Sequence, residues 1–236
     1  MKTSIIVPTY KHDPTGCLEA IRLNTDFGDD VEVVVVANGA PDTTIELVKA
    51  MGKPFRLIVS TEPLGYTRAV NVGVMASKGQ NVILMNDDLV LLNWWKKNDW
   101  IKALEQPFSD PSVVVTGAMR DRWSKDAYFL VFFLVMLHKD KMIELGLLDE
   151  AFSPGCGEDA DFCLKAQAAG YKIVQVPKQM DHWKTDFPLW HSGHATISQC
   201  PEFGEVGKRN QKILDQRYPR TEEDVKLATA FSISGG

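Results

Sequence analysis

Short runs of apolar, mostly β-branched residues recur along the chain, and each run is bounded by residues that are typical of turns. These runs cover 4–8, 31–37, 55–60, 81–86, 112–117 and 171–176. They are apolar at nearly every position rather than at alternate positions. Such a pattern predicts strands of a largely parallel sheet that is buried on both faces.

Between these runs, apolar residues recur with the spacing of an amphipathic helix. Helices are predicted over 17–24, 42–51, 65–79, 138–146 and 158–170. Strand and helix alternate through about residue 90, which predicts βαβ units with right-handed crossovers. The pattern is looser after residue 110. We therefore expect an α/β fold with one mixed, mostly parallel central sheet flanked by helices.

No repeat or low-complexity linker divides the 236 residues. We expect one domain over 1–219, with halves at about 1–90 and 91–219, followed by a C-terminal tail over 220–236. The most apolar run, 129–137, falls short of the roughly 20 residues that a membrane-spanning helix needs. It is better interpreted as a central strand or another buried segment, and we expect no transmembrane segment.

Composition limits which partners and which cellular compartment are expected for the protein. The formal net charge is −5, so the chain lacks the basic character of a nucleic-acid-binding protein and no nucleic-acid partner is expected. The four cysteines show no CxxC spacing, which favours reduced thiols over a metal site or a disulfide framework. The apolar part of the N-terminal segment is too short for a signal peptide. These features predict a cytoplasmic protein.

Polar residues follow three of the predicted strands at their carboxyl ends. Asn86, Asp87 and Asp88 end the strand at 81–86, Asn38 ends the strand at 31–37, and Thr9 follows the first strand. Taken alone, the first group is equally well explained as a polar turn. Parallel α/β sheets bind ligands at this edge, however, and hard divalent cations prefer carboxylate oxygens. Together the three strand ends predict a ligand or metal site.

An ordered set of sequence blocks resembles the family 2 glycosyltransferases of GT-A fold, over roughly residues 3 to 218. The blocks are SIIVPTY, VEVVVVANGAPDTT, EPLGYTRAVNVGVMASKG, VILMNDDLVLL, MIELGLLDEAFSPGCGEDADFCLKAQAAGYKIVQVP and WHSGHAT. The resemblance implies a metal-dependent, inverting glycosyltransferase of hexosyltransferase type. Such an enzyme uses Mn²⁺ or Mg²⁺ to move a sugar from a nucleoside-diphosphate sugar to a hydroxyl of a glycan or other acceptor. The half at 1–90 would bind the nucleotide and the half at 91–219 the acceptor.

The resemblance also implies a metal site of DxD type. NDDL at 86–89 corresponds to the family motif, with Asp88 on the metal, Asn86 near the ribose and Asp87 nearby. Asn86 in the first position leaves fewer anionic ligands. His191 in WHSGHAT corresponds to a family histidine that completes the metal shell, and His194 and His182 remain alternatives.

The ED pair of GED at 157–159 corresponds to the family's catalytic carboxylates. The match implies that Asp159 is the general base and that Glu158 assists or orients. Acidic residues are also favoured in the first turn of any helix, because they complement its dipole. Asp161 is expected to have only that structural role.

The nucleotide pocket is implied by the same resemblance, and its members are Pro8, Thr9, Tyr10, Asn38, Arg68 and Asn71. Ala37 stands where the family usually has an aspartate that accepts a hydrogen bond from uracil. The base of the donor is therefore open, with Asn38 as a substitute acceptor. A solvated helix face is the alternative interpretation of Arg68, and a packed polar residue that of Asn71.

Two other functions are compatible with an α/β chain of this kind. A sugar-phosphate nucleotidyltransferase would be expected to carry a Gly-rich, basic loop after the first strand, whereas PTYKHDPTG contains one glycine. A non-catalytic GT-A-like binding protein is favoured by Ala37 and Asn86, and disfavoured by Asp88, Asp159 and His191. The sugar, acceptor, linkage and oligomeric state are not indicated by the sequence. Peripheral association with a membrane through the acceptor also stays open.

Overall fold

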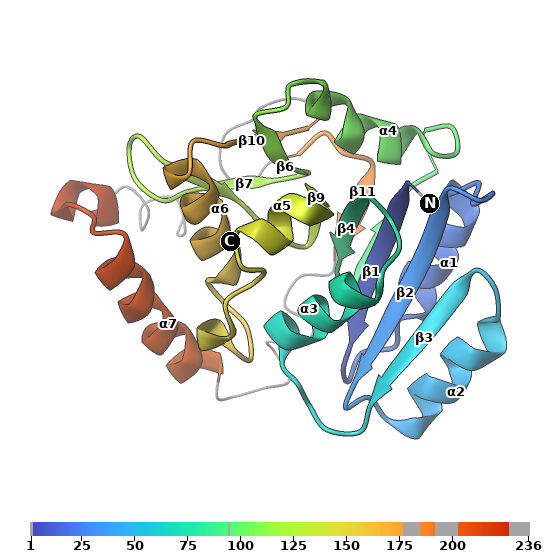
Figure 1. Cartoon of the computed structure of the whole chain (residues 1–236). Helices are drawn as coiled ribbons and strands as arrows, with labels where there is room; N and C mark the ends of the chain where they lie inside the picture. The colour runs from blue at the N-terminus through green and yellow to red at the C-terminus, as the bar shows by residue number, and fades with distance from the viewer. Residues whose placement is uncertain (1, 94, 177–184, 192–202, 227–236) are drawn as a thin grey trace.

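The computed structural model describes residues 2–93, 95–176, 185–191 and 203–226. Its main element is a seven-stranded sheet in the order β10-β6-β9-β4-β1-β2-β3, flanked by helices (Figure 1). The strands are β1 Thr3–Thr9, β2 Val31–Asn38, β3 Phe55–Ser60, β4 Asn81–Met85, β5 Leu89–Leu91, β6 Val113–Gly117, β7 Arg120–Arg122, β8 Tyr128–Leu130, β9 Leu134–His138, β10 Lys172–Gln175 and β11 Leu189–His191. The helices are α1 Thr15–Asn24, α2 Asp42–Met51, α3 Tyr66–Ala76, α4 Asp99–Glu105, α5 Lys139–Glu144, α6 Glu158–Ala168 and α7 Phe203–Arg217, with short 3₁₀ turns at Gln106–Ser109 and Glu150–Phe152.

The sheet is mixed and mostly parallel, as predicted. β1 pairs in parallel with β2 and β4, β2 pairs in parallel with β3, and β10 with β6. β9 runs antiparallel between β4 and β6. The apolar run at 129–137 supplies most of β9, so its interpretation as a central strand is confirmed.

Both faces of the sheet are covered, which explains the continuous apolar strands. Alternate residues of one strand enter different cores, since successive side chains point to opposite faces. Ile5 and Ile83 pack in a cluster with residues of α1 and α4. Ile6 and Leu84 pack in a second cluster with residues of α3, α5 and α6.

A third, smaller cluster joins α7 to the outer side of α6. It contains Trp123, Phe152, Leu164 and Leu214, all buried. The chain after residue 219 continues the packing: the guanidinium of Arg220 lies 4.0 Å from the ring centroid of Trp123. The sequence predicted neither α7 nor α4.

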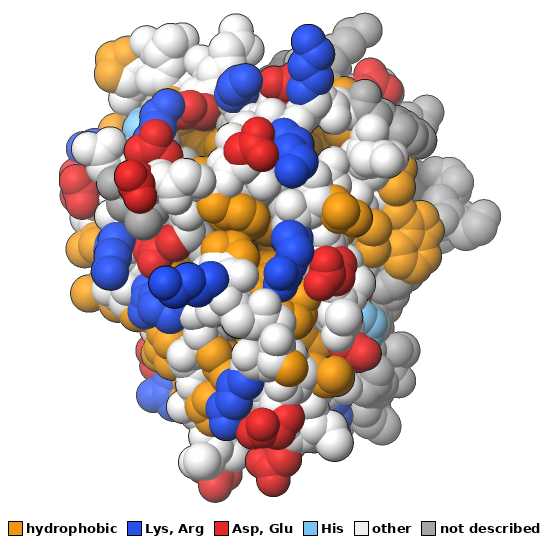
Figure 2. Space-filling model, turned by 90° about the vertical axis from the view of Figure 1, so that its right-hand side faces the viewer, with side chains coloured by type: hydrophobic (Ala, Val, Ile, Leu, Met, Phe, Trp, Pro, Cys, Tyr) orange, Lys and Arg blue, Asp and Glu red, His pale blue; other side chains and the backbone are white. Residues whose placement is uncertain are grey.

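No helix in the described ranges is both long and apolar enough to cross a bilayer. On the side of the molecule that carries β3 and α2, acidic and basic side chains are interspersed and no sign dominates (Figure 2).

Candidate active site

Asp88 and His191, far apart in the sequence, meet at the carboxyl edge of the sheet. After β4 the chain enters the short strand β5, which pairs antiparallel with β11 in a register that places His191 opposite Leu89. His191 Nε2 lies 3.0 Å from Asp88 Oδ1. The imidazole stacks on Phe133, with ring centroids 4.7 Å apart and planes inclined by 25°. A two-stranded ribbon therefore brings together the two residues that the sequence assigned to the metal. His182 and His194 lie outside the described residues.

The backbone of Asn86 is held by two contacts, while one side-chain oxygen of Asn86 and one of Asp87 have no hydrogen-bond partner among the described residues. The Asn86 N–H donates to the Phe133 carbonyl at 2.9 Å, and the Cys17 thiol donates to the Asn86 carbonyl at 3.4 Å. Asn86 Oδ1 and Asp87 Oδ2 are buried without a hydrogen-bond partner. Because buried polar atoms are normally paired, two such oxygens at a strand end indicate a site for a ligand.

Burial raises the pKa of Asp87 to about 6, and the neighbouring charge of Asp88 acts in the same direction. The Thr9 hydroxyl and His12 oppose this rise. His12 Nδ1 lies 3.9 Å from Asp87 Oδ1. The sequence analysis missed His12, although its position just after β1 is a signal of the kind that identified Thr9.

This edge of the sheet suits a divalent cation. A carboxylate oxygen and an imidazole nitrogen, both of which bind Mn²⁺ and Mg²⁺, converge at Asp88 and His191. Within the described ranges, no group of three or more His, Cys, Asp or Glu residues is placed to hold a metal. Mg²⁺-type ions often take only one or two protein ligands and complete their shell with water and substrate phosphates. The residues present fit an ion shared with a diphosphate.

The second pair of acidic residues begins α6. Gly157 precedes it with a φ of 97°, and Glu158 is 7% exposed while Asp159 is more open to solvent. Burial, reinforced by the charge of Asp159, raises the pKa of Glu158 to about 8. Burial also raises the pKa of Asp159, to about 6, although hydrogen bonds from the N–H groups of Ala160 and Phe132 act to lower it. Near pH 7 this combination favours a protonated Glu158 beside an ionised Asp159.

Tyr66 is buried near both acidic pairs, and no pattern in the sequence pointed to it. Its hydroxyl donates to the Phe132 carbonyl at 2.9 Å. Its pKa is raised well above the ordinary value by burial and then by the charges of Glu158, Asp159, Asp88 and Asp87. Both acidic pairs lie beside the segment at 132–133: the Phe132 N–H bonds the Asp159 carboxylate, the Phe133 carbonyl accepts the Asn86 N–H, and the Phe133 ring stacks on His191.

Asp161, also in the first turn of α6, is bound by Arg217 and Tyr218. It is 1% exposed, and its carboxylate lies 2.8 Å from Arg217 Nη1 and 3.1 Å from the Tyr218 hydroxyl. An engaged carboxylate of this kind serves packing, which agrees with the structural role expected for it.

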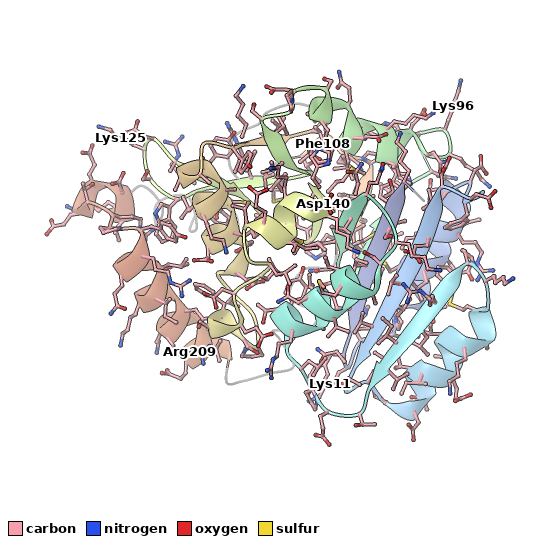
Figure 3. All side chains as sticks on the ribbon, viewed as in Figure 1. Lys11, Lys96, Phe108, Lys125, Asp140 and Arg209 are labelled. Carbon is pink, nitrogen blue, oxygen red and sulfur yellow. The ribbon has the colours of Figure 1, made fainter. Side chains whose placement is uncertain are left out.

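The residues assigned to the nucleotide pocket fall into two groups. Pro8, Thr9 and Tyr10 lie where β1 ends, the edge marked by Lys11 in Figure 3. The Thr9 hydroxyl donates to the His12 carbonyl at 3.3 Å, and Thr9 pairs in register with Ala37, which is fully buried.

The remaining three are engaged by other parts of the protein. Asn38 Oδ1 accepts the Leu64 N–H. Arg68 is exposed and its Nε lies 2.7 Å from Glu150 Oε2. Both ends of the buried Asn71 amide bond the backbone of Leu148: Nδ2 donates to its carbonyl at 2.9 Å, and Oδ1 accepts its N–H at 3.1 Å. The amide of Asn71 is thus used to join α3 to the segment before α6.

A family model described as glycosyl transferase family 2 matches residues 4–156. The chain therefore belongs to this family, which confirms the resemblance found in the sequence and speaks against a nucleotidyltransferase. The matched region contains the Asp88 motif and ends just before Glu158.

Solved structures with the same fold are glycosyltransferases. A mannosyltransferase from Pyrobaculum calidifontis, in complex with GDP-Man and Mn²⁺, is 22% identical with a TM-score of 0.61, and the match covers 75% of this chain and 55% of that one. GalNAc-T7 with UDP, GalNAc and Mn²⁺ is 16% identical with a TM-score of 0.61, covering 75% and 42%. TarS of S. aureus is 19% identical with a TM-score of 0.57, covering 75% and 36%.

One curated relative is the uncharacterized protein y4gI of Sinorhizobium fredii, which is 23% identical over 217 residues. The match covers 74% of this chain and 23% of the relative. The chain thus spans less than two thirds of the length of each of these proteins. At these identities the solved structures establish the fold, GT-A.

Proposed function

We propose that the protein is a divalent-metal-dependent, inverting glycosyltransferase that moves a sugar from a nucleoside-diphosphate sugar to an acceptor hydroxyl. The observation that carries the proposal is that the two acidic pairs lie beside the segment at 132–133, one of them in contact with His191. One pair suits a cation and the other suits proton transfer. Family membership and the Mn²⁺ and nucleotide groups in the solved relatives support the same assignment.

On the donor side, Asp88 and His191 would hold Mn²⁺ or Mg²⁺, with Asn86 and Asp87 presenting oxygens toward the nucleotide. The bound ion supplies positive charge that stabilises the diphosphate as it leaves. The ends of β1 and β2, with Thr9 and Asn38, would border the base and ribose. The Asn38 oxygen already accepts the Leu64 N–H, which leaves its amide nitrogen and one lone pair of the oxygen for a ligand.

On the acceptor side, Asp159 would take the proton of the acceptor hydroxyl. As that proton leaves, the acceptor oxygen forms a bond to the anomeric carbon, and the bond from this carbon to the diphosphate breaks. Glu158, which burial keeps protonated, would orient the acceptor through a hydrogen bond. Its Oε2 is buried without a partner in the protein, so it is available to a substrate group.

A hydrolysis assay tests the proposal without knowledge of the acceptor. A panel of UDP-, GDP-, dTDP- and CDP-sugars is incubated with the protein, with Mn²⁺ or with EDTA, and release of the nucleoside diphosphate is measured. We expect at least one donor to be cleaved only with metal. Proton NMR of the first sugar released should show the anomer opposite to that of the donor. Retained configuration would overturn the single displacement. Release that is indifferent to EDTA would overturn the metal site.

A further inference from the structure

The loop that precedes Glu158 has no regular secondary structure, and α7 holds it from outside. Asn210 of α7 is 1% exposed. Its Nδ2 donates to the backbone carbonyls of Phe152 at 3.0 Å, Gly155 at 2.9 Å and Cys156 at 2.7 Å. Two N–H groups are thus shared among three carbonyls of one short loop.

Arg209 fixes the orientation of this amide. Its Nε donates to Asn210 Oδ1 at 2.9 Å, so the nitrogen of Asn210 must face the loop. Its Nη2 donates to the carbonyls of Ser153 and Ala151. Figure 3 shows Arg209 on α7, where its hydrogen bonds place it beside this loop.

At the C-terminal end of α7, Arg217 binds residues on both sides of the same loop. Arg217 Nη1 lies 2.8 Å from Asp149 Oδ2, before the loop, and 2.8 Å from Asp161 Oδ1, after it. The Tyr218 hydroxyl lies 3.1 Å from Asp161 Oδ1. The loop is therefore tied to α7 at its start, along its length and at its end.

The loop needs such support because its backbone is unusual. Cys156 has a φ of 75° and Gly157 a φ of 97°. A Cβ at Gly157 would lie 3.1 Å from Leu214 of α7 and 3.3 Å from Phe152. A residue other than glycine persists in the left-handed region only when the surrounding structure holds it, and Cys156, two residues before Glu158, is of this kind.

We propose that Asn210 is a positioning residue for the carboxyl pair, through its hold on the loop at 152–157. The inference rests on the proposed role of Asp159 as the base. The family match ends at residue 156, so α7 lies outside the matched region, whereas the loop residues that Asn210 contacts lie inside it. Through this helix the protein would help to set the position of its base.

The test is a double-mutant cycle between Asn210→Ala and Asp159→Asn, with Mn²⁺-dependent hydrolysis of a nucleotide sugar as the readout. Misplacement of a catalytic group by about 1 Å can cost about 100-fold in rate. We expect Asn210→Ala to lower kcat by about 10- to 100-fold, with the Kd for Mn²⁺ and the nucleoside diphosphate unchanged. In the Asp159→Asn background the same change should cost less than about 3-fold, because no base remains to be positioned. Lys212→Ala, an exposed change on the same helix, is the control and should alter neither value.

Equal losses of kcat in both backgrounds would mean a general structural effect and would overturn the positioning role. An unchanged kcat for Asn210→Ala, combined with a large loss for Asp159→Asn, would overturn it while leaving the proposed function intact. A near-normal rate for Asp159→Asn itself would remove the base assignment and the positioning role together. If Asn210→Ala does not fold, Arg209→Met replaces it. That variant removes the donors to the loop from an exposed position, and an unchanged kcat for it would also contradict the inference.

Discussion

The two halves of the molecule place their functional residues by different means. In the half that ends with Asp88, four parallel strands and the helices between them bring Thr9, Asn38 and Asn86 to one edge of the sheet. In the other half, strands are short, and side chains that bond backbone carbonyls hold the loops, as Asn210 does. Strand order places the proposed nucleotide-binding residues, and side-chain contacts hold the loop before the proposed base. A site of the first kind can be recognised from sequence order, whereas one of the second kind depends on particular contacts.

The largest effect is expected where the second half supplies the chemistry. Asp159→Asn keeps the shape of the side chain and the start of α6 but removes the base. Proton transfer by a positioned group typically contributes about 10²- to 10⁴-fold, so kcat should fall by that order while nucleotide and Mn²⁺ binding stay near wild type. Excess Mn²⁺ should not restore the rate. Near-full activity would move the base elsewhere, with Glu158 the next candidate.

A change at the proposed metal site should have a different signature. His191→Ala removes a metal ligand and should weaken Mn²⁺-dependent donor binding by about 10- to 100-fold, the range typical of damage to a metal site. Part of the loss should return at high Mn²⁺. Titration of Mn²⁺ at fixed nucleotide measures both effects. Normal metal and donor binding would leave His182 or His194 as the ligand, or Asp88 and the diphosphate alone.

The pH dependence separates the two carboxyl groups of the second half. Asp159 must be ionised to accept a proton and its pKa is raised to about 6, so the rate should rise as pH increases through 6. Glu158 would act protonated with its pKa raised to about 8, so the rate should fall again above that pH. Glu158→Gln stays neutral and should abolish the alkaline fall while keeping the acid limb. A kcat profile that is the same in both proteins would contradict the role of Glu158.

The sequence predicted the first half well, because its signals are local. Every strand through 81–86 is a continuous apolar run, and the predicted helix 42–51 coincides with α2. The pairing of Asp88 with His191 depends on β5 and β11, which have three residues each and are too short to show a period. The resemblance, rather than any local pattern, predicted that these residues work together.

The missed residues of the second half had weak signals or none. Asn210 lies in the middle of α7, where asparagine is mildly unfavourable, as Asn71 does in α3. An asparagine inside a helix indicates that its side chain makes polar contacts, but it does not show whether those contacts serve packing or binding. For both residues the partners are backbone groups on a distant segment, which only the folded chain reveals.

Asn71 allows a test of whether a residue assigned to the nucleotide pocket serves binding or packing. Asn71→Ala would leave the N–H and carbonyl of Leu148 unpaired, and the free energy of unfolding should fall by about 2 to 3 kcal/mol. Urea denaturation measures the change, with the neighbouring half-exposed Val72→Ala as the control. Nucleotide affinity should be unaffected. A loss of affinity without a loss of stability would place Asn71 in the nucleotide pocket instead.

The smallest expected effect concerns the nucleotide base. Ala37 lies beside Thr9 in the β1–β2 register and offers no hydrogen bond. Ala37→Asp would add an acceptor, and one neutral bond is worth on the order of 1 kcal/mol, so UDP should bind about 5-fold more tightly. Affinities for UDP, GDP, dTDP and CDP, measured before and after the change, give the comparison. The interpretation of this position is wrong if UDP already binds far more tightly than the others and Ala37→Asp weakens it.

The central claim is that a cation at Asp88 links the protein to a nucleoside diphosphate. Isothermal titration of the preferred nucleoside diphosphate into wild type and Asp88→Ala, each with Mn²⁺ and with EDTA, tests it most directly. Asp140→Ala, a change at an exposed aspartate of α5, serves as the control (Figure 3). The account predicts that Mn²⁺ strengthens binding to wild type and to the control, and that Asp88→Ala folds normally but gains nothing from Mn²⁺. Unchanged Mn²⁺-dependent binding in Asp88→Ala would contradict the account.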